Sequence, residues 1–116
     1  MFTAVVGAQN SRLANQYYNT GEYEKAAELY LKLFEKNNKS DSYFNRYIES
    51  LLAIESYEAA EAAIKKEIDR RPSDTQLIVT YGNLFEKKGD TEEADKQYRR
   101  AITTVPADAR IISRIG

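Results

Sequence analysis

Residues 75–108 read TQLIVTYGNLFEKKGDTEEADKQYRRAITTVPAD and decide the fold. Apolar side chains recur in this stretch at helical spacing, as Ile78, Tyr81 and Phe85, and a second apolar run of the same spacing follows Gly89. Glycine readily takes the left-handed conformation that ends a helix. The stretch therefore predicts two amphipathic helices joined by a tight turn.

The same pattern recurs along the whole chain with a period of 34 residues. A small residue recurs as Ala26, Ala60 and Ala94, and a proline recurs as Pro72 and Pro106. A chance alignment would not keep one chemical type in so many columns. The columns of large apolar residues are Leu13, Tyr47, Tyr81 and Ile115; Tyr17, Leu51 and Phe85; Tyr30, Ile64 and Tyr98; and Phe34, Ile68 and Ile102.

We infer three helix-turn-helix units and the start of another. Short connections make the two helices of a unit antiparallel, and we expect Asp74 and Asp108 to be N-caps of the helices that follow them. Glu55 stands where the other units have glycine, so a left-handed residue there would cost about 1 kcal/mol. The expected repeats are about 7–40, 41–74 and 75–108, with a partial fourth or capping helix at 109–116. The expected helices span 9–19, 22–37, 41–54, 57–70, 75–88 and 91–104, with a last piece from 109.

Composition excludes most chemistry. The 116 residues hold 17 Lys plus Arg and 18 Asp plus Glu, and this near balance argues against nucleic acid as a main partner. Histidine and cysteine are both absent, which removes the commonest metal ligand and all thiolate chemistry. No carboxylate, lysine, tyrosine or serine pair is spaced to suggest catalysis. We therefore expect a protein that is not an enzyme and that needs no cofactor and no metal.

The start of the chain leaves its location open. The apolar stretch from Ala4 to Ala8 is far too short to span a bilayer, which takes roughly 20 residues. Val6-Gly7-Ala8 places small residues where a signal peptidase would cut, although no basic segment precedes them. Residues 1–8 are either a signal-peptide remnant, which implies a periplasmic or exported protein, or the ordinary start of a cytoplasmic one.

The repeats resemble the tetratricopeptide-repeat family, whose unit is a 34-residue helix-turn-helix. The second unit departs from the pattern at Ile48, where a small residue is usual, and at Glu55, where glycine is usual. The resemblance implies an all-α fold, a right-handed α-solenoid of antiparallel helix-turn-helix hairpins, forming a single domain over residues 1–116. It is carried by Leu13-Ala14, Tyr17, Gly21 to Ala26 and Tyr30 in the first unit, and by Tyr81-Gly82, Phe85, Gly89-Asp90, Ala94, Tyr98 and Pro106 in the third.

The resemblance also implies a non-catalytic scaffold that binds a peptide or partner segment in a concave groove lined by the first helix of each hairpin. Asn15, Asn45 and Asn83 offer donors and acceptors to an extended backbone, and Tyr18 offers an amphipathic anchor. The candidate groove residues are Ser11, Arg12, Asn15, Tyr18, Asn45, Arg46, Glu49, Gln76, Thr80, Asn83 and Lys87.

One subclass of the family holds the terminal carboxylate of chaperone tails with a clamp of cations and asparagines. Of the corresponding positions Ser11, Asn15, Arg46, Gln76 and Thr80, only Asn15 matches, so we expect no such clamp.

The alternative function is a structural segment with an empty groove that self-associates through its C-terminal edge. Ile111, Ile112 and Ile115 lie in phase with the first helix of a fourth unit and would be exposed there. On the same ground we expect the chain to be a piece of a longer array or a longer protein.

Overall fold

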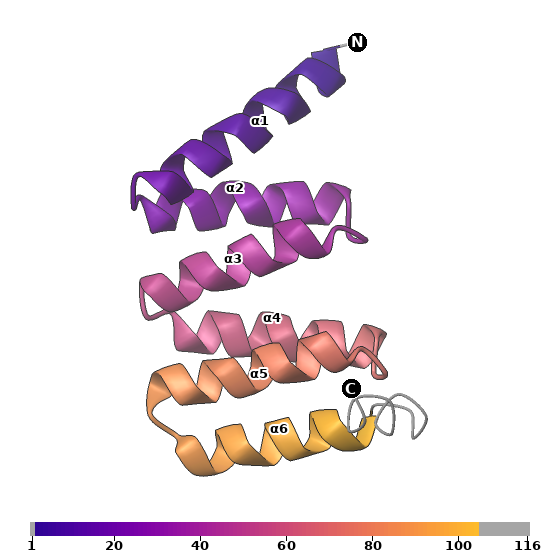
Figure 1. Cartoon of the computed structure of the whole chain (residues 1–116). Coiled ribbons are helices and arrows are strands. Elements are labelled where there is room, and N and C mark those ends of the chain that lie inside the picture. The colour runs from indigo at the N-terminus through magenta and orange to yellow at the C-terminus, as the bar shows by residue number, and fades with distance from the viewer. Residues whose placement is uncertain (1, 105–116) are drawn as a thin grey trace, which may run out of the picture. The chain divides into compact units, whose positions relative to one another are not determined.

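The computed structural model describes residues 2–104, and these form six α-helices without a strand (Figure 1). Side chains are described from Asn10 onward. The all-α class is confirmed, and the helices after the first match the predicted bounds to within one residue at each end. The helices are α1 (Phe2–Asn19), α2 (Tyr23–Lys36), α3 (Asp41–Ala53), α4 (Tyr57–Arg70), α5 (Thr75–Lys88) and α6 (Thr91–Thr104).

Two expectations about the ends of the chain have different outcomes. The predicted start of α1 at Gln9 is wrong, because the helix begins at Phe2. No proline precedes Gln9 to stop a helix there, and Gly7 inside it costs only about 1 kcal/mol. The N-cap expected at Asp108 and the partial helix expected at 109–116 lie outside the described residues.

The chain divides into two compact units, residues 1–57 and 58–116. In the first, α2 packs against both α1 and α3. Its core includes Ala14 and Ala26, both without exposed surface, together with Tyr30 and Leu33. Small residues at these two positions let α1 and α2 approach closely, and the larger side chains fill the seam.

In the second unit α5 packs against α6, and Gly82 allows a close contact with Tyr98. A Cβ atom at Gly82 would lie 2.5 Å from Cε1 of Tyr98, so the tyrosine ring rests on the glycine backbone. Across the same unit, the hydroxyl of Tyr81 on α5 donates to Glu61 on α4 at 3.1 Å. Glu61 also forms an ion pair with Lys65 at 3.3 Å, the i,i+4 pairing expected of a solvated helix face.

The turns between the helices of a hairpin share one backbone conformation in all three repeats. Gly21, Glu55 and Gly89 have φ of 82°, 60° and 87°, so Glu55 takes the same left-handed conformation as the two glycines. The next residue's N–H bonds a carbonyl five residues back in each case, at 2.8 Å, as in Ser56 to Leu51. Glu55 therefore carries backbone strain that glycine would not.

A buried carboxylate, not predicted from the sequence, holds the connection from α4 to α5. Glu67 is 4% exposed although its column otherwise contains Leu33 and Ala101. Its Oε1 lies 2.6 Å from Arg70 Nη1, and its Oε2 lies 3.3 Å from Arg71 Nη2. Arg71 also pairs with Asp74 at 3.2 Å, and Asp74 is the predicted N-cap of α5, accepting from the N–H of Leu77. The ion pairs thus tie the end of one helix to the start of the next.

Replacing Glu55 by glycine should stabilise the protein. Removing the left-handed strain raises the free energy of unfolding by about 1 to 2 kcal/mol. The greater conformational freedom of glycine in the unfolded chain lowers it again by about 0.4 to 1 kcal/mol. A net gain of about 1 kcal/mol is expected in urea unfolding. Gly21→Ala is the matched control. The added Cβ would meet nothing within 4 Å, so the loss of stability in this variant would measure the cost of the left-handed conformation alone. An unchanged or lower stability of Glu55→Gly would contradict the strain at this turn.

Replacing Gly82 by alanine should destabilise the protein by about 1 to 3 kcal/mol, because the added methyl group overpacks the contact with Tyr98. Thermal unfolding followed by circular dichroism measures the loss. Gly82→Ala combined with Tyr98→Leu should recover part of it, since the rigid ring is then absent. A loss that is the same in both backgrounds would show that the ring is not the obstacle.

High pH should unfold the protein partly through Tyr81. Burial raises the pKa of Tyr81 from 10.0 to about 12, and the hydrogen bond to Glu61 adds to the rise. The folded state therefore binds this proton more tightly than the unfolded state, so the stabilisation is complete below pH about 10 and is lost as pH rises toward about 12. Urea unfolding across that range should show a shallower fall for Tyr81→Phe than for the wild type. Equal slopes would contradict the raised pKa.

Candidate functional site

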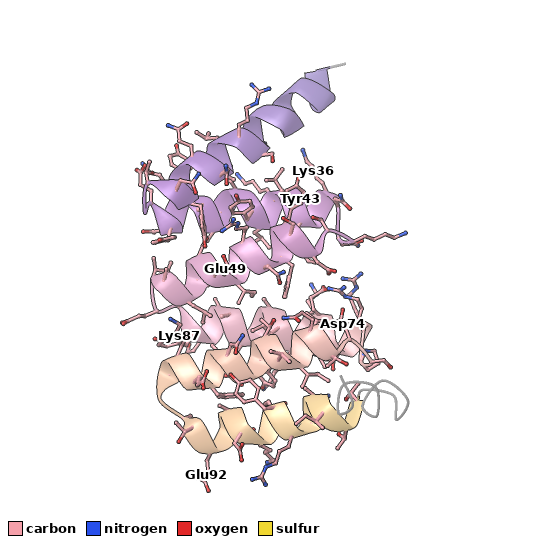
Figure 2. All side chains as sticks on the ribbon, viewed as in Figure 1. Lys36, Tyr43, Glu49, Asp74, Lys87 and Glu92 are labelled. Atoms are coloured by element: carbon pink, nitrogen blue, oxygen red, sulfur yellow. The ribbon has the colours of Figure 1, made fainter. Side chains whose placement is uncertain are left out.

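Seven of the predicted groove residues belong to the first unit and lie on α1 and α3. Among them Arg12, Asn15, Asn45 and Glu49 are exposed, while Ser11, Tyr18 and Arg46 are half-buried. We call these seven residues the α1–α3 face. Figure 2 shows the side chains of both helices, with Glu49 labelled on α3.

Three residues of this face form a bonded group across the two helices, which we call the Tyr18 cluster. The hydroxyl of Tyr18 donates to Oε2 of Glu49 at 2.6 Å. The Nη1 of Arg46 lies 3.3 Å from the same oxygen, and its guanidinium carbon lies 4.1 Å from the centroid of the Tyr18 ring. The ion pair and the cation–π contact hold Arg46 and Tyr18 in one arrangement.

Electrostatics keep the Tyr18 hydroxyl protonated. The hydrogen bond to Glu49 raises the pKa of Tyr18 above its usual value, burial and the charge of Glu49 raise it further, and Arg46 opposes the rise. The ring also packs edge-on against Tyr23, with centroids 5.6 Å apart. Tyr18 is therefore a fixed aromatic side chain whose polar tip is already bonded.

Asn15 and Asn45 lie beside this cluster, but their side chains are not bonded as those of the cluster are. Both are exposed, and within the described residues neither side chain forms a hydrogen bond. Each amide can both donate and accept. The α1–α3 face therefore combines a fixed aromatic group with amides that are open to a ligand.

The remaining predicted groove residues lie on α5 in the second unit. Gln76 and Asn83 are exposed, as is Lys87, which Figure 2 labels, whereas Thr80 is half-buried and its hydroxyl donates to the carbonyl of Gln76 at 2.9 Å. The Oδ1 of Asn83 accepts the hydroxyl of Tyr98 at 2.7 Å, and Glu86 lies 3.0 Å from that hydroxyl.

Tyr98 stands in the same repeat column as Tyr30 and Ile64, which are buried, but its own position differs. It is only half-buried, because its ring covers Gly82 while its hydroxyl reaches out to the polar face of α5. The other tyrosines of the core columns divide in the same way. Tyr30 and Tyr81 are 4% and 7% exposed, and Tyr17 and Tyr47 are half-buried.

The described part of the chain contains no group of three or more Asp or Glu side chains arranged to hold a metal ion. None of its helices is long and apolar enough to cross a membrane.

Comparison with known proteins places these helices in a family. The tetratricopeptide-repeat family model matches residues 75–107. The TPR repeat-containing protein MJ1428 of Methanocaldococcus jannaschii is 32% identical over 88 residues. The chain belongs to the tetratricopeptide-repeat family. The aligned part is 76% of this chain and 16% of the MJ1428 protein, so the chain corresponds to a small part of that relative.

Solved structures agree with this tetratricopeptide fold. The MamA structure designated MSR-1 C2 has a TM-score of 0.65 and 22% identity, covering 87% of this chain and 56% of its own. The MamA structure of AMB-1 has a TM-score of 0.64 and 19% identity, covering 89% and 58%. They confirm the fold class predicted from the sequence, an α-solenoid of helical hairpins. Repeats of this family generally mediate interactions between proteins.

Proposed function

We propose that the chain is a non-catalytic interaction module and that the α1–α3 face binds an extended segment of a partner protein. The observation that carries the proposal is the pair of exposed, unbonded amides of Asn15 and Asn45, which stand about one helical turn before Tyr18 and its partner Glu49. The α5 face is a separate, weaker candidate, since Asn83 already accepts a hydrogen bond from Tyr98.

An extended peptide leaves its own N–H and C=O groups to be bonded by whatever binds it. An asparagine amide supplies a donor and an acceptor from one side chain. Asn15 and Asn45, on two helices of one unit, can thus both bond peptide groups of one segment without regard to its side chains. Such a face recognises the backbone first and the sequence second.

The Tyr18 cluster supplies an anchor beside these amides. Tyrosine offers a large apolar ring at little conformational entropy, and here the stacking of Arg46 and the bond to Glu49 have already removed most of that freedom. A ligand that packs on this ring therefore orders little of the protein. Because Glu49 neutralises Arg46, the cluster itself attracts neither an acidic nor a basic segment strongly.

Peptides selected from a random library on the full chain test this function. Asn15→Ala and Asn45→Ala should each weaken binding of a selected peptide, measured by fluorescence anisotropy, by about 2- to 12-fold, because each removes hydrogen bonds worth about 0.5 to 1.5 kcal/mol. Asn38→Ala is the matched control, since Asn38 is exposed in the turn between α2 and α3.

Binding that Asn38→Ala weakens as much as the two face variants would place the contact elsewhere. Selected peptides that bind all three variants like the wild type would refute the role of the α1–α3 face. An acidic chaperone-type tail is included in the measurement, and strong binding of it would contradict the expected absence of a carboxylate clamp.

A further inference from the structure

An open hollow lies in the first unit where the start of α2 meets the end of α3. Its volume is about 610 Å³, and it is lined by Tyr23, Glu24 and Glu28 of α2 and by Ile54, the C-cap of α3. We call these four residues the α2–α3 corner. Because the hollow is open to solvent, it suits the side chains of a docked segment better than an enclosed small molecule.

Ile54 gives this corner an exposed apolar side chain. It is 38% exposed, and the other two repeats have Thr20 and Lys88 in the same column. The half-buried ring of Tyr23 lines the same hollow. Covering these two side chains removes apolar surface from water, so an apolar group that docks here is stabilised.

The corner also carries two exposed carboxylates. Glu24 and Glu28 lie one turn apart on α2, where like charges repel, and within the described residues neither forms an ion pair or a hydrogen bond. The helix dipole favours Glu24 in the first turn but not Glu28. The nearby Lys25 is already paired with Glu22 at 3.2 Å and lies 5.3 Å from the centroid of the Tyr17 ring. The corner therefore combines apolar surface with uncompensated negative charge.

The second unit shows what occupies the equivalent corner. Lys88 stands there in the column of Ile54, and its Nζ lies 3.9 Å from Oε1 of Glu61 on α4. A cation of the chain itself thus approaches a carboxylate of the preceding hairpin, whereas Ile54 brings no cation to α2. The column of Glu28 holds Ala62 and Lys96 in the other repeats, so the pair of carboxylates is peculiar to the first unit.

We propose that the α2–α3 corner docks a segment of a partner protein that carries a Lys or Arg next to an apolar side chain. The apolar side chain packs on Ile54 and Tyr23, and the cation pairs with Glu24 and Glu28, as Lys88 pairs with Glu61 in the second unit. An acidic segment is repelled. This site is separate from the α1–α3 face, and the proposal does not depend on binding there.

NMR spectra of the isotope-labelled full chain test the corner with three defined probes. N-acetyl-leucyl-lysine amide should shift the signals of Ile54, Glu24 and Glu28. N-acetyl-leucyl-norleucine amide has no charge and should bind about 2- to 30-fold more weakly, the factor expected from two exposed ion pairs. N-acetyl-leucyl-glutamate amide should leave the corner signals unchanged.

Substitutions of the carboxylates test the charge recognition. Glu24→Gln and Glu28→Gln should each weaken binding of the lysine probe by about 1.4- to 5-fold and leave the norleucine probe unaffected. Glu58→Gln is the matched control and should change neither, because Glu58 is also exposed and occupies the same place in the first turn of α4.

Two substitutions of Ile54 test the apolar part of the site. Ile54→Thr introduces the residue that the first repeat has in this column, and it should weaken binding of both the lysine and the norleucine probe. Ile54→Lys brings to the corner the cation that the second unit already has, and it should remove the preference for the lysine probe. Circular dichroism checks that both variants remain helical.

Four results would overturn the proposal. The first is the absence of any shift at the corner with the lysine probe, and the second is equal affinity for the lysine and glutamate probes. Shifts centred on Asn15 and Tyr18 would assign the probe to the α1–α3 face instead. Corner signals that move with protein concentration in the absence of a probe would assign the hollow to a second copy of the chain.

Discussion

Close approach of two helices within a hairpin is the constraint on which the rest of the structure depends. Ala26 and Ala94 are nearly without exposed surface, and Gly82 lets the ring of Tyr98 rest on the backbone of α5. Where helices approach this closely, every side chain of the seam has a fixed size. The 34-residue columns of the sequence keep their residue types because of that requirement.

Packing of the second helix against the first leaves the polar side of the first helices for other uses. On α1 and α3 that side holds two exposed amides and the Tyr18 cluster, whose tyrosine packs against the core of the first unit. Tyr18 thus connects the candidate site to the core, whereas Asn15 and Asn45 are exposed. A substitution at either asparagine can therefore test the proposed binding without changing the fold.

The fold was predictable because its signals are local and repeated. Period, breakers and caps placed the helices after α1 closely, and the repeat register identified Glu55 as the position where a left-handed turn would be strained. The Tyr18 cluster was not predictable as a bonded group, since its hydrogen bond joins residues 31 positions apart and depends on rotamers. The partial exposure of Tyr98 was not predictable for a related reason. A repeat column gives the position of the residue on its helix but not the direction in which its hydroxyl points.

The burial of Glu67 was not predicted from the sequence either, and it bears on how the hairpins assemble. Repeats that share apolar columns can pair with the wrong neighbour, because one seam resembles another. Arg70 and Arg71 follow Glu67 by three and four residues, so both cations stay with the carboxylate wherever α4 packs. The positions equivalent to Arg71 hold Asn37 and Val105. A helix that packed on the wrong seam would keep these ion pairs, so the carboxylate does not penalise a misaligned stack. The ion pair from Arg71 to Asp74 instead holds the start of α5 at the end of α4 through contacts that are local in sequence.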